Sequence, residues 1–250
     1  TVPTANINTV TSLNVTRKNI SDLTGIEDFI ALNYLSSGNN NLGSLDLSTN
    51  TALIELDIRN NNLTSLDVTK NTNLILLYSK NNNLSSLDVT KNTDLTTLNL
   101  TKNKLTSLDV TKNTALIELY LNDNNLTSLD VTKNTALNYL YIGTTSDFEN
   151  KNATLTKERN KLTELDVTKN IFLEDLDVNG QNLTSLNLNK NTALTELVCA
   201  NNNLTSLNIK NGNNINLDRF NATGNTALTC INVDNLANIG AGWKKDTTAS

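Results

Sequence analysis

The chain has 250 residues, of which 37% are hydrophobic and 4% aromatic, with 20 Lys and Arg, 25 Asp and Glu and no His. The net charge of −5, with both signs interspersed, leaves no basic stripe for a phosphate backbone, so nucleic-acid binding is excluded as an expected function. The absence of His removes the commonest general base and rules out Ser-His, Cys-His and histidine-metal sites.

Residues 1–31 are expected to form an N-terminal cap and the first repeat. The opening TVPTANINTV lacks the charged and apolar regions of a signal peptide, and no run of about eighteen apolar residues occurs anywhere. We therefore expect no transmembrane segment in this chain.

A motif of the form Leu-x-x-Leu-x-Leu-x-x-Asn-x-Leu recurs along the sequence. LIELDIRNNNL from Leu53 and LIELYLNDNNL from Leu116 are clean copies. A period near the bottom of the range of roughly 20 to 29 residues predicts leucine-rich repeats, which we place at 32–227. The copies are spaced by 22 residues, then 21 five times, then 36, 21 and 23, and they start at Val10, Leu32, Leu53, Leu74, Leu95, Leu116, Leu137, Leu173, Leu194 and Leu217.

Each repeat alternates apolar and polar residues with a period of two around Leu56, Ile58 and their equivalents, which predicts a strand. The second half, LTSLDVTKNTN at 63–73, alternates in the same way and predicts a short strand or extended segment on the opposite, convex side. The expected fold is therefore a mostly β solenoid of the α/β class. It is a right-handed leucine-rich-repeat horseshoe with a parallel concave sheet, short convex strands and little or no helix.

Two rows of asparagines are predicted to be structural, because buried backbone groups in tight turns need hydrogen-bond partners. One row follows each strand, and the other closes the opposite turn. The first is Asn40, Asn61, Asn82, Asn103, Asn124, Asn160, Asn202 and Asn225; the second is Asn50, Asn71, Asn92, Asn113, Asn134, Asn170 and Asn191.

The 21-residue unit resembles the leucine-rich repeats of secreted Bacteroidetes surface proteins, and ISDLTGIEDFIAL from Ile20 resembles the internalin type. The tail from Leu228 is similar to the C-terminal cap of flavobacterial proteins that carry a sorting domain further on. We expect 228–250 to form this cap, with Trp243 packing on the open apolar end. The resemblance implies a recognition module that is secreted or lies on a bacterial cell surface.

The convex half barely varies between repeats, whereas the outward positions three, five and seven of the concave half do. All five tyrosines of the chain fall in this variable set. Tyrosine suits a surface that is wet when free and buried when bound, although aromatic residues also suit strand surfaces for packing alone. The predicted ligand-binding residues are Tyr34, Tyr78, Glu118, Tyr120, Tyr139, Tyr141, Asp175 and Asp177.

The spacing of 36 marks an insertion at 144–158, directly after the strand that ends at Tyr141. A loop there can overhang one edge of the concave face, and it adds Phe148 as a further candidate contact. A tolerated insertion with no role is the alternative, because lengthening a loop costs little.

The convex side repeats an aspartate in six coils, at Asp46, Asp67, Asp88, Asp109, Asp130 and Asp166. Stacked like charges repel, so we expect the lysines three residues on to compensate them. Calcium binding is the sharper alternative, but no glycine-containing calcium loop accompanies the carboxylates. Cys199 should point into the core and Cys230 outward, so a disulfide between them is not expected.

We expect a non-catalytic, monomeric recognition module without cofactor or metal, binding a protein partner through its concave face. A polysaccharide ligand is the first alternative, and a passive spacer is the second. An enzyme using a carboxylate pair such as Glu118 with Asp177 is disfavoured, because open strand ladders rarely shift pKa values enough.

Overall fold

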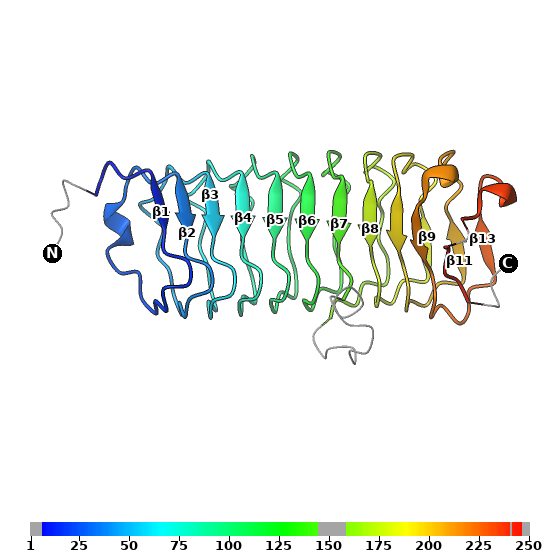
Figure 1. Cartoon of the computed structure of the whole chain (residues 1–250), viewed down its shortest axis with the longest axis horizontal. Coiled ribbons are helices and arrows are strands. Elements are labelled where there is room, and N and C mark those ends of the chain that lie inside the picture. The colour runs from blue at the N-terminus through cyan, green and yellow to red at the C-terminus, as the bar shows by residue number, and fades with distance from the viewer. Residues whose placement is uncertain (1–6, 145–158, 241, 247–250) are drawn as a thin grey trace.

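The computed structural model describes residues 7–144, 159–240 and 242–246. The chain winds into a row of coils, and each coil contributes one three-residue strand to a parallel sheet along the molecule (Figure 1). The ten strands of this sheet, in spatial order, are β1 (Ser12–Asn14), β2 (Tyr34–Ser36), β3 (Glu55–Asp57), β4 (Leu76–Tyr78), β5 (Thr97–Asn99), β6 (Glu118–Tyr120), β7 (Tyr139–Tyr141), β8 (Asp175–Asp177), β10 (Glu196–Val198) and β12 (Arg219–Asn221).

Every strand of this sheet occupies positions three to five of a predicted repeat, and neighbouring strands pair in register, as Leu56 does with Leu77. Position four points inward, so Leu56, Leu77 and Leu98 are fully buried in one continuous core. Truncating such a leucine to alanine typically costs about 2–5 kcal/mol. The predicted parallel solenoid with almost no helix is confirmed.

The turn after every strand of this sheet except β7 has a left-handed residue at position eight. Asn39, Asn60 and Asn81 have φ of 57°, 55° and 57° there, and Gly180 has φ of 69°. Asparagine and glycine tolerate this region better than other residues. Lys102, with φ of 57°, holds the same position without either advantage.

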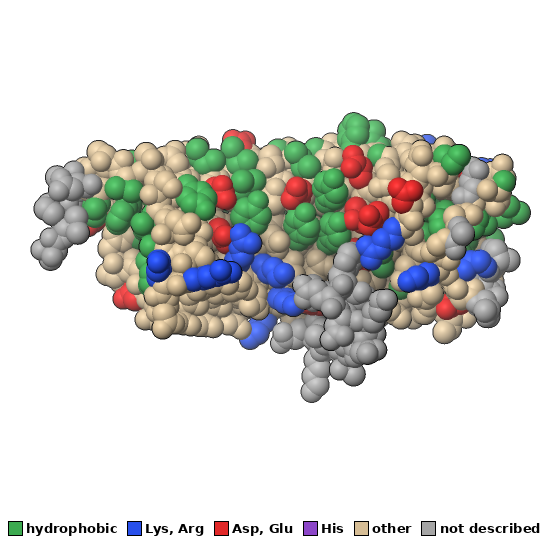
Figure 2. Space-filling view, viewed as in Figure 1, with side chains coloured by type: hydrophobic (Ala, Val, Ile, Leu, Met, Phe, Trp, Pro, Cys, Tyr) green, Lys and Arg blue, Asp and Glu red, His purple; other side chains and the backbone are tan. Residues whose placement is uncertain are grey.

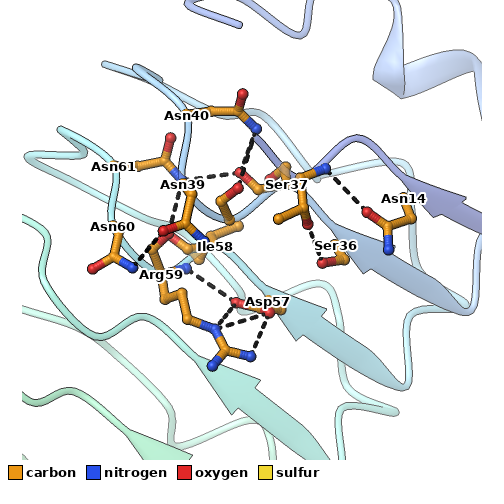
Figure 3. Close-up of polar contacts among 12 residues, drawn as sticks. Asn14, Ser36, Ser37, Asn39, Asn40, Asp57, Ile58, Arg59, Asn60 and Asn61 are labelled. Atoms are coloured by element: carbon orange, nitrogen blue, oxygen red, sulfur yellow. Dashed lines mark hydrogen bonds and ion pairs between the residues drawn. The ribbon is translucent and has the colours of Figure 1, made fainter. Parts of the chain in front are cut away.

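The asparagine row after the strands ties neighbouring coils together, as predicted. The Asn61 Nδ2 donates to the carbonyl of Ile58 in its own coil and to that of Ser37 in the preceding coil, at 3.0 and 3.1 Å (Figure 3). Its Oδ1 accepts from the Leu42 N–H at 3.0 Å. In one coil Gln181 replaces asparagine and accepts from the Leu162 N–H in the same way.

The second row closes the opposite turn with its amide donors. The Asn92 Nδ2 donates to the carbonyls of Val68 and Asn71 at 3.0 and 2.8 Å. Each buried Oδ1 of this row lacks a hydrogen-bond partner within the described part of the chain. Both rows therefore satisfy backbone groups between coils, which is a structural role.

Strand pairing on the convex side is confined to the last coils. Among the described residues, the convex strands β9 (Ser185–Asn187), β11 (Ser206–Asn208) and β13 (Cys230–Asn232) form one three-stranded parallel sheet. Each of these strands ends in asparagine, whereas the unpaired coils carry aspartate at that position. We attribute the difference to charge, because stacked aspartates repel and the Asn208 Nδ2 can donate to the Asn187 Oδ1 at 3.4 Å.

Within the described ranges the helical content is three short 3₁₀ segments: η2 (Ile26–Asp28), η3 (Asn214–Asn216) and η4 (Leu236–Asn238). Trp243 covers the last coil as predicted, with its ring centroid 4.6 Å from that of Phe220 and its Nε1 donating to the Leu217 carbonyl at 3.0 Å. Cys199 is buried and Cys230 exposed, also as predicted. No helix in the described ranges is long and apolar enough to cross a bilayer.

Candidate functional site

The outward side chains of the ten-stranded sheet form two rows, from positions three and five of each coil. Strand neighbours in a sheet lie about 4.8 Å apart, so equivalent side chains of adjacent coils can touch. Figure 2 shows apolar and acidic side chains over the strands of this face, with Lys and Arg side chains along one border. We call this surface the sheet face.

Three predicted tyrosines meet over β6 and β7. The rings of Tyr120 and Tyr141 stack with centroids 5.1 Å apart and planes inclined by 14°. The Tyr120 hydroxyl donates to the Glu118 carboxylate at 3.2 Å, and the Tyr139 hydroxyl donates to the Glu174 carboxylate at 3.3 Å. The predicted aromatic and acidic patch is thus a set of direct contacts at this place.

Burial raises the pKa values of Tyr120 and Tyr141, and the neighbouring carboxylates raise them further. For Tyr139 the Glu174 charge is the first cause of the raised pKa. All three hydroxyls therefore stay protonated at neutral pH and act as hydrogen-bond donors. The negative charge of the patch resides on its carboxylates alone.

Asp175 connects the tyrosines to the next strand. Its Oδ2 accepts a hydrogen bond from the Tyr141 hydroxyl, while its Oδ1 has no hydrogen-bond partner. The residue is 8% exposed, and this burial raises its pKa to about 6. Asp175 is thus a largely buried carboxyl group, and one of its oxygens has no hydrogen-bond partner.

Asp177, two residues further along β8, is fully buried. Its Oδ1 accepts from the backbone N–H and the Nδ2 of Asn179 at 2.9 and 2.7 Å, and its Oδ2 has no partner. Burial raises its pKa to about 7, although the Asn179 hydrogen bonds oppose the shift. The side chain fits only because position seven of the preceding coil is Gly143, where a Cβ would lie 2.4 Å from the Asp177 Oδ1.

The other two predicted tyrosines lie apart from this cluster. Arg59 lies over the Tyr78 ring, 5.7 Å from its centroid, while its guanidinium contacts Asp57 at 2.7 Å (Figure 3). Tyr34 is half-buried on β2, next to Glu55 on β3. The sheet face therefore carries two separate groups of predicted residues.

Several residues of this surface were not predicted as ligand contacts. Glu174 accepts from a tyrosine, and Glu196 pairs with Arg219 at 3.2 Å. Glu196 and Arg219 both hold position three of their repeats, as the predicted residues Tyr139 and Asp175 do. A prediction based on repeat position alone would have included Glu196 and Arg219, whereas a prediction based on tyrosines and nearby acidic residues omitted them. Phe148 and the rest of the insertion after Thr144 lie outside the described residues.

The convex side has an acidic groove that could be an alternative binding site to the sheet face. A groove of about 670 Å³ there is lined by Asp130, Asp166 and Glu164 together with Thr132 and Thr168. No group of three or more Cys, Asp or Glu side chains in the described ranges is arranged to hold a metal ion. Calcium binding on this side therefore gains no support from the geometry.

The lysines offset the repulsion between the convex aspartates, since Lys91 lowers the pKa of Asp88 by more than Asp67 raises it, but threonines stabilise these carboxylates more strongly. The Asp88 Oδ1 accepts from the hydroxyl and the N–H of Thr90 at 2.7 and 2.9 Å, and the hydroxyl is the largest cause of the lowered pKa of Asp88. Lys91 contributes less, and the described residues contain no ion pair between these two rows. A threonine two residues on reaches the carboxylate locally, whereas a long lysine side chain stays in water.

The chain is similar in both fold and sequence to a solved bacterial structure. The functional domain of InlJ from Listeria monocytogenes matches 92% of the chain at 30% identity, with a TM-score of 0.54. The chain is an internalin-like leucine-rich-repeat protein. The resemblance to Bacteroidetes surface repeats stays a prediction.

Two further structures share the fold of this internalin-like protein. A leucine-rich-repeat protein of Leptospira interrogans matches 88% of the chain at 21% identity with a TM-score of 0.64, and internalin C2 of Listeria monocytogenes matches 98% at 16% with 0.58. The chain spans only 60% of the InlJ chain and 62% of the Leptospira chain. No family model matches it. No curated protein matches it either.

Proposed function

We propose that this internalin-like protein is a non-catalytic recognition module that binds a protein partner through its sheet face. The observation that carries the proposal is the contact cluster of Tyr120, Tyr139 and Tyr141 with Glu118 and Asp175. Solenoids of this kind use extended concave surfaces for binding. A secreted or cell-surface location is part of the same proposal.

The tyrosine cluster has the properties of an interface centre. Tyr120 and Tyr141 are half-buried and stacked, so their rings are already ordered before a partner arrives. Preorganised aromatic side chains lose little conformational entropy on binding and are frequent hot spots. Their hydroxyls are already engaged with carboxylates, so a partner can bury the rings without leaving unpaired donors.

Catalysis is not part of the proposal, for a physical reason. The two carboxyl groups with the most raised pKa values, Asp175 and Asp177, sit two residues apart on one strand. Asp177 is fully buried and hydrogen-bonded to Asn179, so it cannot act as a base on an external substrate. The raised pKa values are explained by burial without any reaction.

A random peptide library displayed on phage tests the proposal, because it needs no known partner. Peptides selected on the wild-type protein are measured against Tyr120→Ala with Tyr141→Ala, and against the convex-groove control Asp130→Asn with Asp166→Asn. Loss of a hot spot costs about 2 kcal/mol or more, so we expect binding to the tyrosine variant to weaken more than roughly tenfold. Binding to the groove variant should stay unchanged.

Three outcomes would overturn the proposal. Peptides that bind the tyrosine variant as well as the wild type would place the site elsewhere, and loss only in the groove variant would move it to the convex side. Hits on a glycan array without peptide binders would favour the polysaccharide alternative. The double variant Tyr120→Phe with Tyr141→Phe, which keeps the rings, checks that the alanine variant failed through lost contact and not through misfolding.

A further inference from the structure

A row of exposed isoleucines borders the sheet face where its strands begin. Ile54, Ile75 and Ile117 hold position two of their coils and are 39%, 38% and 40% exposed. Backbone hydrogen bonds of 2.8 to 2.9 Å link Ile54 to Ile75, Ile75 to Thr96 and Thr96 to Ile117, so the row is continuous over four coils. The coils before and after this stretch carry polar residues at position two. The isoleucine row is therefore confined to one part of the face.

The apolar surface continues from this row onto β4. Leu76 and Tyr78 hold positions three and five of that strand, and both are partly exposed. Arg59 lies over the Tyr78 ring and forms an ion pair with Asp57, so these two charges balance each other. The surface of β4 therefore offers apolar contacts between the two ends of the strands.

Three lysines lie at the other end of the strands in the same part of the face. Lys80 holds position seven of its coil, and Lys102 and Lys104 hold positions eight and ten of the next coil. None of the three forms an ion pair within the described part of the chain. Lys102 and Lys104 line a hollow of about 270 Å³, whose acidic lining residue, Asp123, is buried. Figure 2 shows Lys and Arg side chains along this border, where they form a local excess of positive charge.

The isoleucine row and the lysines are close enough for one peptide segment to contact both. Positions two and seven lie five residues apart along an extended strand, which corresponds to about 16 Å. A helical segment with its side chains is about 10–12 Å wide, and the lysine side chains can reach over the remaining distance. The row also ends at Ile117, directly before Glu118 of the tyrosine cluster. One partner can therefore cover this area and the tyrosine cluster together.

We call the isoleucine row, Leu76, Tyr78 and the three lysines the aliphatic–basic patch. We propose that this patch binds a segment of the protein partner that carries aliphatic side chains on one side and Asp or Glu on the other. Covering the isoleucines removes apolar surface from water, and the partner's carboxylates complement the lysines. Glu55, directly after Ile54, repels carboxylates on the isoleucine side and so fixes the orientation of the segment.

The inference rests on the proposed function, since it names the chemistry of the partner at a second area of the same sheet face. An anionic polysaccharide is disfavoured, because it would pair with the lysines and leave the isoleucine row uncovered.

The test selects displayed peptides on the tyrosine variant, which lacks the tyrosine cluster and keeps the aliphatic–basic patch. Fluorescence polarisation then measures the affinities of the labelled peptides. Lys80→Gln with Lys102→Gln removes two charges from the patch, and Lys70→Gln with Lys91→Gln removes two from the convex side as a matched control. We expect the first pair to weaken binding about threefold or more at low ionic strength, with a smaller effect in high salt, and the second pair to leave it unchanged.

A second comparison tests the apolar row. Ile54→Thr with Ile75→Thr gives two coils the residue that Thr96 already holds at the same position, so the fold should tolerate it. Ile215→Thr, which removes a 70% exposed isoleucine from η3, is the control. We expect the double variant to weaken binding about tenfold, because less apolar surface is covered, and the control to have no effect. A thermal melt that matches that of the tyrosine variant excludes misfolding.

The expected peptides combine Leu, Ile or Phe with Asp or Glu. The absence of selected peptides, peptides without acidic residues, or equal weakening by the patch and control variants would overturn the inference. Heparin is the probe for the polysaccharide. Heparin binding that depends on the lysines and not on the isoleucines, with no peptides selected, would also overturn it.

The inference and the proposed function fail separately. Peptides selected on the wild type that depend on the tyrosines, together with no binders of the tyrosine variant, would overturn the inference and leave the proposed function intact. Peptides that depend on the isoleucines and lysines, while those selected on the wild type ignore the tyrosines, would keep the aliphatic–basic patch and overturn the tyrosine cluster as the site.

Discussion

The burial of Asp177 predicts a stability that falls as pH rises. Its pKa is about 7 in the folded protein against an ordinary value of 3.8, because burial penalises the charged form. The folded state therefore holds its proton more tightly than the unfolded state. This contribution is fully present below about pH 4 and is lost as pH rises through about 7.

The size of the effect follows from the width of this window. Each pH unit in which only the folded state is protonated changes the free energy of unfolding by about 1.4 kcal/mol. Because the folded state itself begins to lose the proton near pH 7, the interval between about pH 5 and pH 7 contributes about 2 kcal/mol. Asp175, whose pKa is also raised, acts in the same direction. The convex aspartates, whose pKa values are lowered, act with the opposite sign and only at lower pH.

Asp177→Asn isolates this contribution. Asn99 and Asn221 occupy the same position in other coils, where their Oδ1 atoms accept from the N–H groups of Thr101 and Thr223 at 3.1 Å. Asparagine therefore fits the turn but does not titrate. Urea unfolding followed by circular dichroism between about pH 5 and pH 8 should show the loss in the wild type and a much smaller one in the variant.

Two results would refute this reasoning. A wild-type stability that is flat or rises over this pH range would show that Asp177 is ionised at no cost in the folded state. A variant that keeps the full wild-type slope would assign the titration to another group. Matching urea m-values in the two proteins would confirm that the comparison concerns the same unfolding transition.

Two further predictions concern the turns. Lys102→Asn should raise the free energy of unfolding by about 1 kcal/mol, because asparagine tolerates the left-handed region better than lysine. Its Nδ2 can also donate to the Asn81 Oδ1, as the Asn81 Nδ2 donates to the Asn60 Oδ1 one coil earlier. Lys104→Asn is the control, and equal effects of the two substitutions would contradict the explanation. Asn103→Ala should lower the free energy of unfolding by about 2 kcal/mol, since it leaves the buried Leu84 N–H unpaired, whereas the Ser79 and Leu100 carbonyls keep hydrogen bonds from Asn82 and Asn124; thermal and urea melts that show a loss under about 1 kcal/mol would contradict this.

The alternation of residues within each repeat predicted most of the fold. Whether Leu56 or Leu77 points inward depends only on the period of two along its own strand, and stacking coils then makes the core continuous. The asparagine rows were predictable for the same local reason, since each turn repeats the same unpaired backbone groups. The placement of tyrosines on one face followed from this register.

What the sequence could not decide is how each polar side chain of that face is paired and buried. Glu118 and Asp175 hold the same position in their coils, yet only Asp175 is buried with a free oxygen beside Tyr141. Likewise, Asp57 forms an ion pair with Arg59, whereas Asp177 at the same position of its coil is hydrogen-bonded to Asn179. Register comes from local periodicity, whereas burial and charge pairing depend on side chains from neighbouring coils, and only the tertiary structure brings those together.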